Sequence, residues 1–463
     1  MARSRPGCYR SESGPVPSSR AALPRRLLGT IRLVRDLPGQ AGFLHRRAAL
    51  VRRDQERRLR RMVAHAFRHV PYYGETMRRL GIDPDGIRTV SDLARLPILE
   101  RSQLQRDPDF FRSRARPLAD LLELRSGGSS GAPLSVFHDP DALLQNTAHG
   151  EREVAVLRSL VGRRRFRMLC VASTHGTETD VRATVRAHAW IPGAAEGERT
   201  NVDIGDSPEF AARRLDATRA DVVAGYGSYL DALAQVLERE PGLHRPRVVA
   251  YGGDALPEPA RGRMVERLGL RVWSSYQAIE SFKIGFECGH GTGLHLHADL
   301  APLRIVDDAG AEVPVGTPGS VILSNLVNTG SVILNYRLGD VAALLPGTCP
   351  CGSTLPLLSF PLGRVEDWLA LPGGRRLHSQ RLRSILGPET LLWEFQVVQE
   401  AADHVRVLLV KAAEADAHVV AERVGPEIRD ALGHDVRVDL VFVDAVERTA
   451  GGKVRTIVRR GDT

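Results

Sequence analysis

The residues of this chain whose types and spacing can do chemistry fall into four short motifs, the first of them rich in glycine and serine. Its members are Ser126, Gly127, Gly128, Ser129, Ser130 and Gly131. Strand-like segments flank it, Leu121 to Arg125 and Leu134 to Phe137. Because glycines let backbone N–H groups approach an anion and serine hydroxyls add donors, this loop can hold a phosphate. It is not a Walker loop, since no Lys-Ser/Thr pair follows. A simple turn is the alternative.

Two further motifs each present a carboxylate after a strand-like segment. Tyr276-Gln277-Ala278-Ile279-Glu280 follows the segment Arg271 to Ser275. Since ligands gather at the carboxyl ends of strands in α/β sheets, Glu280 can hold magnesium against a triphosphate. Tyr336-Arg337-Leu338-Gly339-Asp340 places Asp340 at an expected strand end, where it can accept both hydroxyls of a ribose. A solvated loop carboxylate and an ordinary Gly-Asp turn are the respective alternatives.

The fourth motif is a glycine loop near the C-terminus that carries Lys453. Of the 64 lysines and arginines in the chain, only Lys283, Lys411 and Lys453 are lysines. An ammonium on such a loop can neutralise the charge that develops on a carboxylate and an α-phosphate during attack. The arginine bias therefore favours a functional role for Lys453 over surface solvation.

Three of the five cysteines fall in a window that also contains histidines. The candidates are Cys288, Cys349 and Cys351 with His290, His295 and His297. Three thiolates and one imidazole match the tetrahedral coordination of a structural zinc ion. The window therefore predicts a zinc site, with three free buried thiols as the alternative.

The elements that must position these motifs alternate between strands and helices. An amphipathic helix is expected over Gln55 to Leu80. Strands are predicted for Phe166–Ala172, Asp221–Tyr226, Arg247–Tyr251 and Arg271–Ser275, with a helix over Pro259–Leu268 between the last two. This pattern is typical of an α/β layered domain with parallel strands.

Beyond Asp299 the pattern changes to closely spaced strands, which predicts an antiparallel subdomain. The predicted strands are Pro302–Val306, Gly319–Ser324 and Val332–Tyr336. A new unit follows, with strands at Val405–Val410 and Val436–Val443 on either side of a helix over Ala417–Leu432. The sequence thus predicts an α/β fold: a disordered segment at 1–25, a large N-terminal domain at 26–362 and a small mobile C-terminal α+β domain at 363–463.

Composition narrows the class of protein. With 43% hydrophobic and 26% charged residues the chain can form a real core. The net charge of +9 is spread along the chain without aromatic interleaving, which argues against nucleic acid as a partner. Few cysteines and no secretory signal favour a cytoplasmic protein, and no apolar stretch approaches the roughly 20 residues of a membrane span. Composition does not decide whether the protein forms a homodimer.

The four motifs, in this order and at these separations, resemble those of the adenylate-forming superfamily of acyl-CoA ligases, adenylation domains and luciferases. The branch that the chain most resembles is phenylacetate-CoA ligase. The resemblance runs from about Arg57 to Arg459 and includes Val70-Pro71-Tyr72-Tyr73, the Gly252-Gly253-Asp254 turn and Gly363-Arg364-Val365-Glu366-Asp367.

This resemblance implies a role for each matching residue. Ser126 to Gly131 would form the phosphate loop, and Gly252, Gly253, Asp254 and Tyr276 would line the adenine pocket. Glu280 would hold magnesium, Asp340 the ribose, and Arg364 would contact the nucleotide. Glu366 falls at the hinge and Lys453 at the adenylation lysine, while His295 matches the histidine of the metal-binding members.

The activity implied is ATP-dependent conversion of a carboxylic acid, aromatic in this branch, to acyl-AMP and then to a coenzyme A thioester. Departures from the family pattern at Gln277, Ile279, Glu366, Ala132, Leu134 and Gly227 bear on substrate and turnover more than on ATP use. A carrier protein or an amine as acceptor is an alternative, as is adenylylation of a deazaflavin cofactor. From another class, a basic zinc-containing nucleic-acid binder would bind DNA or RNA in a salt-sensitive way without releasing pyrophosphate.

Overall fold

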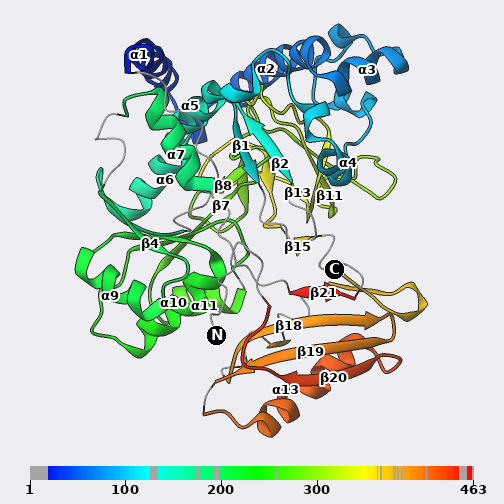
Figure 1. Cartoon of the computed structure of the whole chain (residues 1–463). Coiled ribbons are helices and arrows are strands. Elements are labelled where there is room, and N and C mark those ends of the chain that lie inside the picture. The colour runs from blue at the N-terminus through cyan, green and yellow to red at the C-terminus, as the bar shows by residue number, and fades with distance from the viewer. Residues whose placement is uncertain are drawn as a thin grey trace, which may run out of the picture.

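The computed structural model describes residues 19–460 except 126–133, 173–176, 192–197, 257, 362, 365–367, 379–381, 383–384, 387–388, 390, 413 and 448–455. It forms two units, seen in Figure 1 as a larger body above a smaller one. The N-terminal unit runs from α1 (Ser19–Asp36) to β15 (Gly363–Arg364), and the C-terminal unit from β16 (Trp368–Ala370) onward. Helix α1 includes residues 19–25 of the segment that was expected to be disordered.

A nine-stranded sheet of order β13-β14-β9-β8-β7-β6-β5-β3-β4 forms the centre of the N-terminal unit. Its parallel half is made of β3 (Arg167–Ala172), β4 (Glu198–Asp203), β5 (Val222–Gly225), β6 (Val248–Tyr251) and β7 (Arg271–Tyr276). Its antiparallel half is made of β8 (Gly285–Glu287), β9 (Leu294–Leu296), β13 (Leu344–Leu345) and β14 (Leu357–Leu358). The predicted parallel strands are confirmed, and β4 is an additional edge strand.

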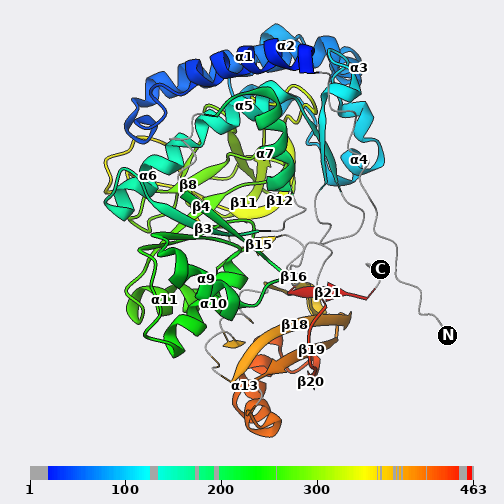
Figure 2. The same cartoon turned by 60° about the vertical axis from the view of Figure 1, so that its left-hand side comes forward.

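Both faces of the parallel half are covered. Val222 and Val248 face one buried cluster, while their neighbours Val223 and Val249 face another. Burial on both sides explains why these strands are almost continuously apolar in sequence. The second cluster lies under α9 (Pro208–Thr218), α10 (Gly227–Arg239) and α11 (Glu258–Glu266), which gather on one side of the sheet in Figure 2.

The antiparallel subdomain is a four-stranded sheet of order β10-β11-β12-β15. Its strands are β10 (Leu303–Val306), β11 (Gly319–Leu323), β12 (Tyr336–Ala342) and β15. The strand predicted at Val332–Tyr336 is wrong, because β12 only begins at Tyr336. The apolar run before it is buried, but its backbone bonds outside this sheet: the Val332 N–H donates to the Phe111 carbonyl at 3.1 Å. Asn335 then turns the chain with a φ of +56°.

Helices cover the rest of the N-terminal unit, and the one predicted over Gln55–Leu80 is in fact two. Pro71 has no N–H to donate and disfavours a helical conformation at Val70, whose φ is −116° and ψ 116°. The apolar side chains predicted to pack inward, such as Leu59 and Val63, are fully buried. The helices are α2 (Ala48–His69), α3 (Pro71–Leu80), α4 (Arg101–Arg106), α5 (Pro140–His149), α6 (Glu151–Val161) and α7 (Thr177–His188).

Short 3-10 turns and one hairpin complete this unit. The turns are η1 (Phe43–His45), η2 (Pro84–Gly86), η3 (Ser91–Arg95), η4 (Pro108–Phe111) and η5 (Leu118–Asp120). The hairpin is formed by β1 (Leu122–Arg125) and β2 (Ser135–His138). In the part of the chain that the structure describes, no helix combines the length and the apolar composition that crossing a bilayer requires.

The C-terminal unit has its own core. Its sheet has the order β20-β19-β18-β21, with β18 (Leu392–Ala401), β19 (His404–Lys411), β20 (Arg437–Phe442) and β21 (Ile457–Arg459). Helix α13 (Ala417–Leu432) has the bounds that the sequence predicts, while β18 and β21 are additional to the predicted strands. A two-stranded ribbon of β16 and β17 (Arg376–His378) and the turn η7 (Pro372–Gly374) complete it.

The buried residues of the C-terminal cluster lie between Leu369 and Ile457, and those of the large N-terminal cluster end at Leu358. Strand β15 pairs with β12, so the N-terminal sheet extends to Arg364. The boundary between residues 362 and 363 stays a prediction.

A buried ion pair holds the N-terminal unit together where α6 meets the segment after β9. The two terminal guanidinium nitrogens of Arg152 donate to the carboxylate of Asp299 at 2.8 Å, and both side chains are 2% exposed. Burial by itself raises the pKa of Asp299, but the Arg152 charge and its hydrogen bonds outweigh this and lower it. The Arg152 guanidinium also lies 3.4 Å from the centre of the Phe43 ring.

We expect Asp299→Ala to lower the free energy of unfolding by about 3–5 kcal/mol, because it leaves the buried Arg152 charge without its counter-ion. Urea denaturation measures this change. Glu238→Ala is the matched control: Glu238 pairs at 3.0 Å with Arg267, which is 64% exposed, and its loss should change the free energy by less than about 1 kcal/mol. Equal effects of the two substitutions would contradict a special role for the buried pair.

Candidate active site

The hairpin predicted around the Gly/Ser loop is present. Strands β1 and β2 pair antiparallel from Leu122 opposite His138 to Arg125 opposite Ser135. As predicted, a strand, β2, follows the loop and not a helix. His138 at the end of β2 is fully buried, and its Nε2 lies 2.9 Å from the carbonyl oxygen of Ile279. The hairpin is therefore attached directly to the segment that carries Glu280. Ser126, Gly127, Gly128, Ser129, Ser130 and Gly131 themselves lie outside the described residues.

Glu280 lies beyond the carboxyl end of β7, as predicted, and is 4% exposed. The reading of Glu280 as a solvated loop residue is therefore wrong. Its carboxylate accepts a hydrogen bond from the Tyr336 hydroxyl at 3.1 Å, and its backbone carbonyl accepts one from Asn325 Nδ2 at 2.7 Å. An Arg101 guanidinium nitrogen lies 3.9 Å from the carboxylate.

Asp340 of the four-stranded sheet contacts Tyr276 of the nine-stranded sheet. The Tyr276 hydroxyl donates a hydrogen bond to the Asp340 carboxylate at 2.5 Å. The expected position of Asp340 at a strand end is wrong, because it lies inside β12. Ile322 of β11 pairs with Arg337 and Ser320 pairs with Val341, so three residues of β12 lie opposite one residue of β11. The resulting bulge contains Gly339, whose φ of +92° suits glycine, and it re-aims the following side chain.

Asp254, expected beside an adenine, binds the start of α10. Its carboxylate accepts hydrogen bonds from the backbone N–H of Gly227, from the Ser228 N–H at 3.4 Å and from the Ser228 hydroxyl at 2.7 Å. These N–H groups belong to the first turn of the helix, which has no partners for them of its own. A Cβ on Gly227 would lie 2.8 Å from the Ala255 carbonyl oxygen, which explains glycine at this departure from the family pattern.

Gly252 and Gly253 lie directly after β6, beside the end of β7. A Cβ on Gly252 would lie 3.2 Å from the Ser275 carbonyl oxygen, so the two strand ends approach closely here. Gly253 has a φ of +83°. These residues therefore lie at the same sheet edge as Tyr276.

The last predicted residues are only partly described. The backbone of Arg364 in β15 pairs with that of Asp340 in β12, which brings these two motifs together. Nothing is described of the Arg364 side chain, and Glu366 and Lys453 lie outside the described residues. Strand β21, which follows Lys453 in the chain, is the edge of the C-terminal sheet nearest the N-terminal unit in Figures 1 and 2.

Two residues that touch Glu280 were not assigned a role from the sequence. Tyr336 is part of a motif that was singled out for its aspartate alone. Burial, and then the neighbouring Glu280 charge, raise the pKa of Tyr336, so its hydroxyl is a hydrogen-bond donor at neutral pH. Arg101 is one of the many arginines of the chain and lies at the start of a short helix. No local sequence pattern indicates its contact with Glu280.

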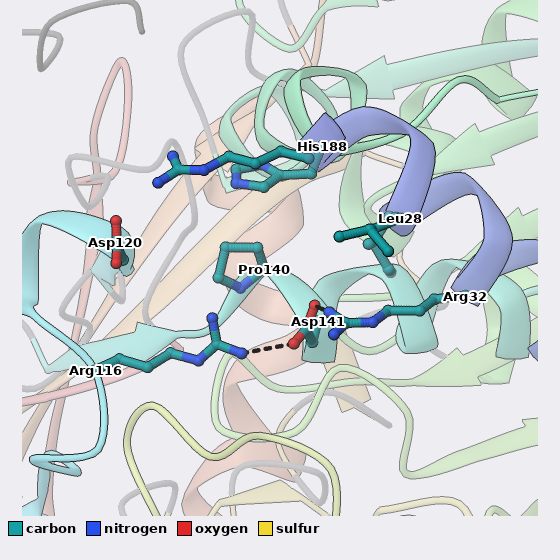
Figure 3. A pocket seen from close by; sticks show the side chains of 10 residues that line it. Leu28, Arg32, Arg116, Asp120, Pro140, Asp141 and His188 are labelled. Carbon is teal, nitrogen blue, oxygen red and sulfur yellow. Dashed lines mark hydrogen bonds and ion pairs between the residues drawn. The ribbon is translucent and has the colours of Figure 1, made fainter. Parts of the chain in front are cut away.

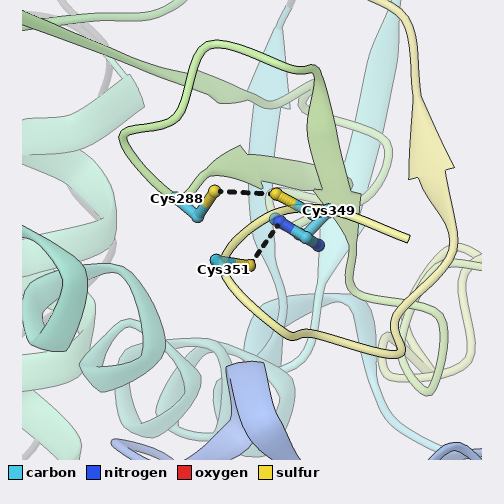
Figure 4. A group of neighbouring side chains, drawn as sticks. Cys288, Cys349 and Cys351 are labelled. Atoms are coloured by element: carbon cyan, nitrogen blue, oxygen red, sulfur yellow. Dashed lines mark hydrogen bonds between the residues drawn. The ribbon is translucent and has the colours of Figure 1, made fainter.

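The cysteine window forms a compact group of potential metal ligands (Figure 4). One ligand atom from each of Cys288, His295, Cys349 and Cys351 lies within 4.8 Å of all the others. Cys288 Sγ and Cys349 Sγ are 3.4 Å apart, and Cys351 Sγ lies 3.5 Å from His295 Nε2. Zinc–sulfur bonds of about 2.3 Å in a tetrahedron separate the sulfurs by about 3.8 Å, so the donor set fits zinc. Burial lowers the pKa of His295 to about 4, which keeps the imidazole neutral for coordination.

The other two histidines of that window do not join this group. His297 is fully buried and its Nε2 lies 3.3 Å from the Glu153 carboxylate, which also accepts a hydrogen bond from Lys283 Nζ at 2.7 Å. Because Lys283 follows Glu280 by three residues, this pair fixes the far end of the same segment. His290 is not part of the four-residue group either.

A pocket elsewhere in the N-terminal unit lies between α1, α5 and α7 (Figure 3). Asp141 in it accepts hydrogen bonds from both Arg116 and Arg32, so these charges are paired with each other. Its lining residues include none of the residues predicted for the site.

Comparison with known proteins gives a consistent set of relatives. Residues 369–460 match the CapK C-terminal domain family. The phenylacetate-coenzyme A ligase of Thermus thermophilus is 27% identical over 435 residues, which cover 87% of this chain and 95% of that protein. The phenylacetate-coenzyme A ligase of Escherichia coli K12 is 25% identical over 87% of this chain and 93% of its own length.

Solved structures share the fold. A 2-hydroxyisobutyryl-CoA ligase in the postadenylation state superimposes with a TM-score of 0.73 at 18% identity, covering 92% of each chain. The same enzyme in the thioesterification state gives 0.57.

We expect Asp254→Ala to lower the free energy of unfolding by about 0.5–2 kcal/mol, because the first turn of α10 loses its acceptor. Urea denaturation tests this, with Asp308→Ala in the exposed turn after β10 as the control. Asp254→Asn, which keeps one acceptor oxygen, should fall between wild type and Asp254→Ala. Stability of Asp254→Ala equal to that of the control would show that the cap contributes nothing.

Proposed function

Since the chain is a homologue of the phenylacetate-coenzyme A ligases and has the fold of the acyl-CoA ligases of the adenylate-forming superfamily, we propose that it is an AMP-forming acid–thiol ligase. It uses ATP to convert a carboxylic acid to its acyl-AMP and then transfers the acyl group to coenzyme A. The substrate class we propose is an aromatic acid, in line with the names of the curated relatives.

The observation that carries the proposal is the meeting of three separate motifs at the carboxyl end of β7. Tyr276 binds Asp340, Tyr336 binds Glu280, and His138 of the hairpin binds the carbonyl of Ile279. These contacts support the proposal that Asp340 and Glu280 act as ribose and metal ligands next to the loop between β1 and β2. The carboxyl end of β7 lies at the edge of a parallel sheet at which ligands gather.

In this proposal each residue keeps the role that the family resemblance implies. Ser126 to Gly131 bind the phosphates, Gly252, Gly253 and Tyr276 line the adenine pocket with Asp254 fixing its wall, and Asp340 binds the ribose. Glu280 is the carboxylate that would hold Mg²⁺, which when bound neutralises charge on the triphosphate. Arg364 contacts the nucleotide and Glu366 lies at the hinge between the two units.

The chemistry has two displacement steps. A carboxylate oxygen of the acid attacks the α-phosphorus, the bond to the bridging oxygen breaks, and pyrophosphate leaves. Lys453 neutralises charge that develops during this attack. The thiolate of coenzyme A then attacks the acyl carbon and AMP leaves. Rotation of the C-terminal unit between the steps withdraws Lys453 and opens the path for the thiol.

Lys453→Ala should slow acid-dependent pyrophosphate release by roughly 100-fold or more, because one preorganised positive charge is lost from the transition state. Lys411→Ala, in β19 of the same unit, is the control and should keep the wild-type rate. The assay is run with aryl, fatty and amino acids, each with and without coenzyme A, which also identifies the acid and the acceptor. A wild-type rate for Lys453→Ala would remove Lys453 from the mechanism.

We also propose that Cys288, His295, Cys349 and Cys351 hold a structural zinc ion. The support is the donor set and its compactness, and four protein ligands leave no open position for chemistry. These ligands connect the segment after β8, strand β9 and the loop between β13 and β14, so the ion would join the antiparallel half of the large sheet.

Elemental analysis of the purified protein should find one zinc per chain. Cys349→Ser should lose the zinc and unfold at a lower temperature, because binding free energy at such a site contributes to folding. Cys170→Ser is the control for zinc content and should keep the ion, since Cys170 lies in β3 outside the group. Wild-type protein that contains no zinc after purification with added zinc would refute the site.

A further inference from the structure

The Arg101 side chain reaches the proposed magnesium ligand from a part of the chain that carries none of the recognised motifs. One of its guanidinium nitrogens lies 3.9 Å from the Glu280 carboxylate. Arg101 also interacts with the hydroxyl of Tyr336, which itself donates to Glu280. Three residues that are far apart in sequence thus form one cluster, in which Arg101 supplies the positive charge.

Backbone hydrogen bonds fix the place of Arg101. The segment before α4 runs beside the start of β12: the Leu99 N–H donates to the Asn335 carbonyl and the Arg337 N–H donates to the Leu99 carbonyl, both at 2.9 Å. An ion pair of 3.0 Å between Glu100 and Arg337 adds to this pairing. Gln103 accepts a hydrogen bond from the Glu100 N–H at 2.8 Å, which starts the helix at Arg101.

The electrostatics of this cluster change when a divalent cation binds. Glu280 is almost completely buried, whereas the Arg101 side chain is 22% exposed. A cation with two charges on the Glu280 oxygens would repel a guanidinium a few ångströms away, and in a partly buried site this repulsion is poorly screened. The anion that arrives together with that cation is the triphosphate of ATP, and guanidinium groups bind phosphate oxygens by paired hydrogen bonds.

Building on the proposed function, we propose that Arg101 is a triphosphate-binding residue that leaves Glu280 for the β- and γ-phosphates when Mg-ATP binds. It then stabilises pyrophosphate as the leaving group. In the resting protein Glu280 holds Arg101 in place, so the guanidinium group is already beside the position that the triphosphate would occupy. Tyr336 keeps Glu280 oriented during the exchange.

This role is confined to one half-reaction. Only ATP and pyrophosphate carry the β- and γ-phosphates, so Arg101 has no phosphate partner of this kind once pyrophosphate has left. Loss of Arg101 should therefore slow the formation of acyl-AMP but not its reaction with coenzyme A. A residue that merely stabilised the fold would affect both steps alike.

The test measures the two half-reactions separately in wild type, Arg101→Ala, Arg101→Lys and Arg106→Ala. Arg106 is the exposed arginine at the other end of α4 and serves as the matched control. In Arg101→Ala we expect the KM for ATP and the inhibition constant for pyrophosphate to rise by about 10-fold or more, as loss of a charge-assisted phosphate contact does. Arg101→Lys should recover part of this loss, and thioester formation from supplied acyl-AMP should stay within about twofold of wild type.

Calorimetric binding of Mg-ATP without any acid extends the test to a protein whose acid is not yet identified. We expect weaker binding in Arg101→Ala and unchanged binding in Arg106→Ala. Equal slowing of both half-reactions, or unchanged binding of ATP and pyrophosphate in Arg101→Ala, would overturn the proposal. A wild-type protein that binds Mg-ATP but forms no acyl-AMP with any acid would instead refute the proposed function.

Discussion

Two tyrosine–carboxylate hydrogen bonds join the nine-stranded sheet to the four-stranded sheet, and the candidate site depends on them. Tyr276, at the end of β7, donates to Asp340 of β12, while Tyr336 of β12 donates to Glu280, beyond the end of β7. Each sheet thus supplies one tyrosine and one carboxylate to the other. If either sheet moved relative to its partner, both carboxylates would lose their orientation at once.

The segment between β7 and β8, which carries the proposed metal ligand Glu280, is held from several other directions, and a binding residue on an irregular segment needs such support. Its carbonyl groups bind His138 and Asn325, and its Lys283 binds the buried Glu153. Phe282 has a φ of +61°, an unusual conformation for an aromatic residue that the surrounding contacts maintain. The proposed zinc group begins directly after β8, the strand that follows this segment.

The buried charges of the N-terminal unit fall into two kinds. Arg152 and Asp299 are both almost completely buried and bind each other bidentately, which makes their pairing permanent in the folded protein. Glu280 is also buried, but its cationic neighbour Arg101 is 22% exposed and lies 3.9 Å from the carboxylate, instead of the 2.8 Å between Arg152 and Asp299. The first arrangement stabilises the fold, and the second leaves room for an exchange of partners.

The sequence by itself determined the parallel strands, helix α13, the hairpin around the glycine loop and the cysteine group. These features follow from local patterns: apolar runs, turn residues and ligand types at short spacing. It failed where a contact with a distant residue decided the outcome. Val332 to Leu334 look like a strand, but their backbone bonds to Tyr73 and Phe111, and the bulge that places Asp340 inside β12 depends on its pairing with β11.

Only the tertiary structure decided which of several similar residues perform a role. His295 joins the cysteines while His297 joins Glu153, although two positions separate them in the chain. Arg101 meets Glu280 because the segment before α4 pairs with the start of β12, and no local pattern distinguishes it among so many arginines. Side-chain types limit the chemistry that is available, but the packing of segments far apart in sequence selects the side chains that meet.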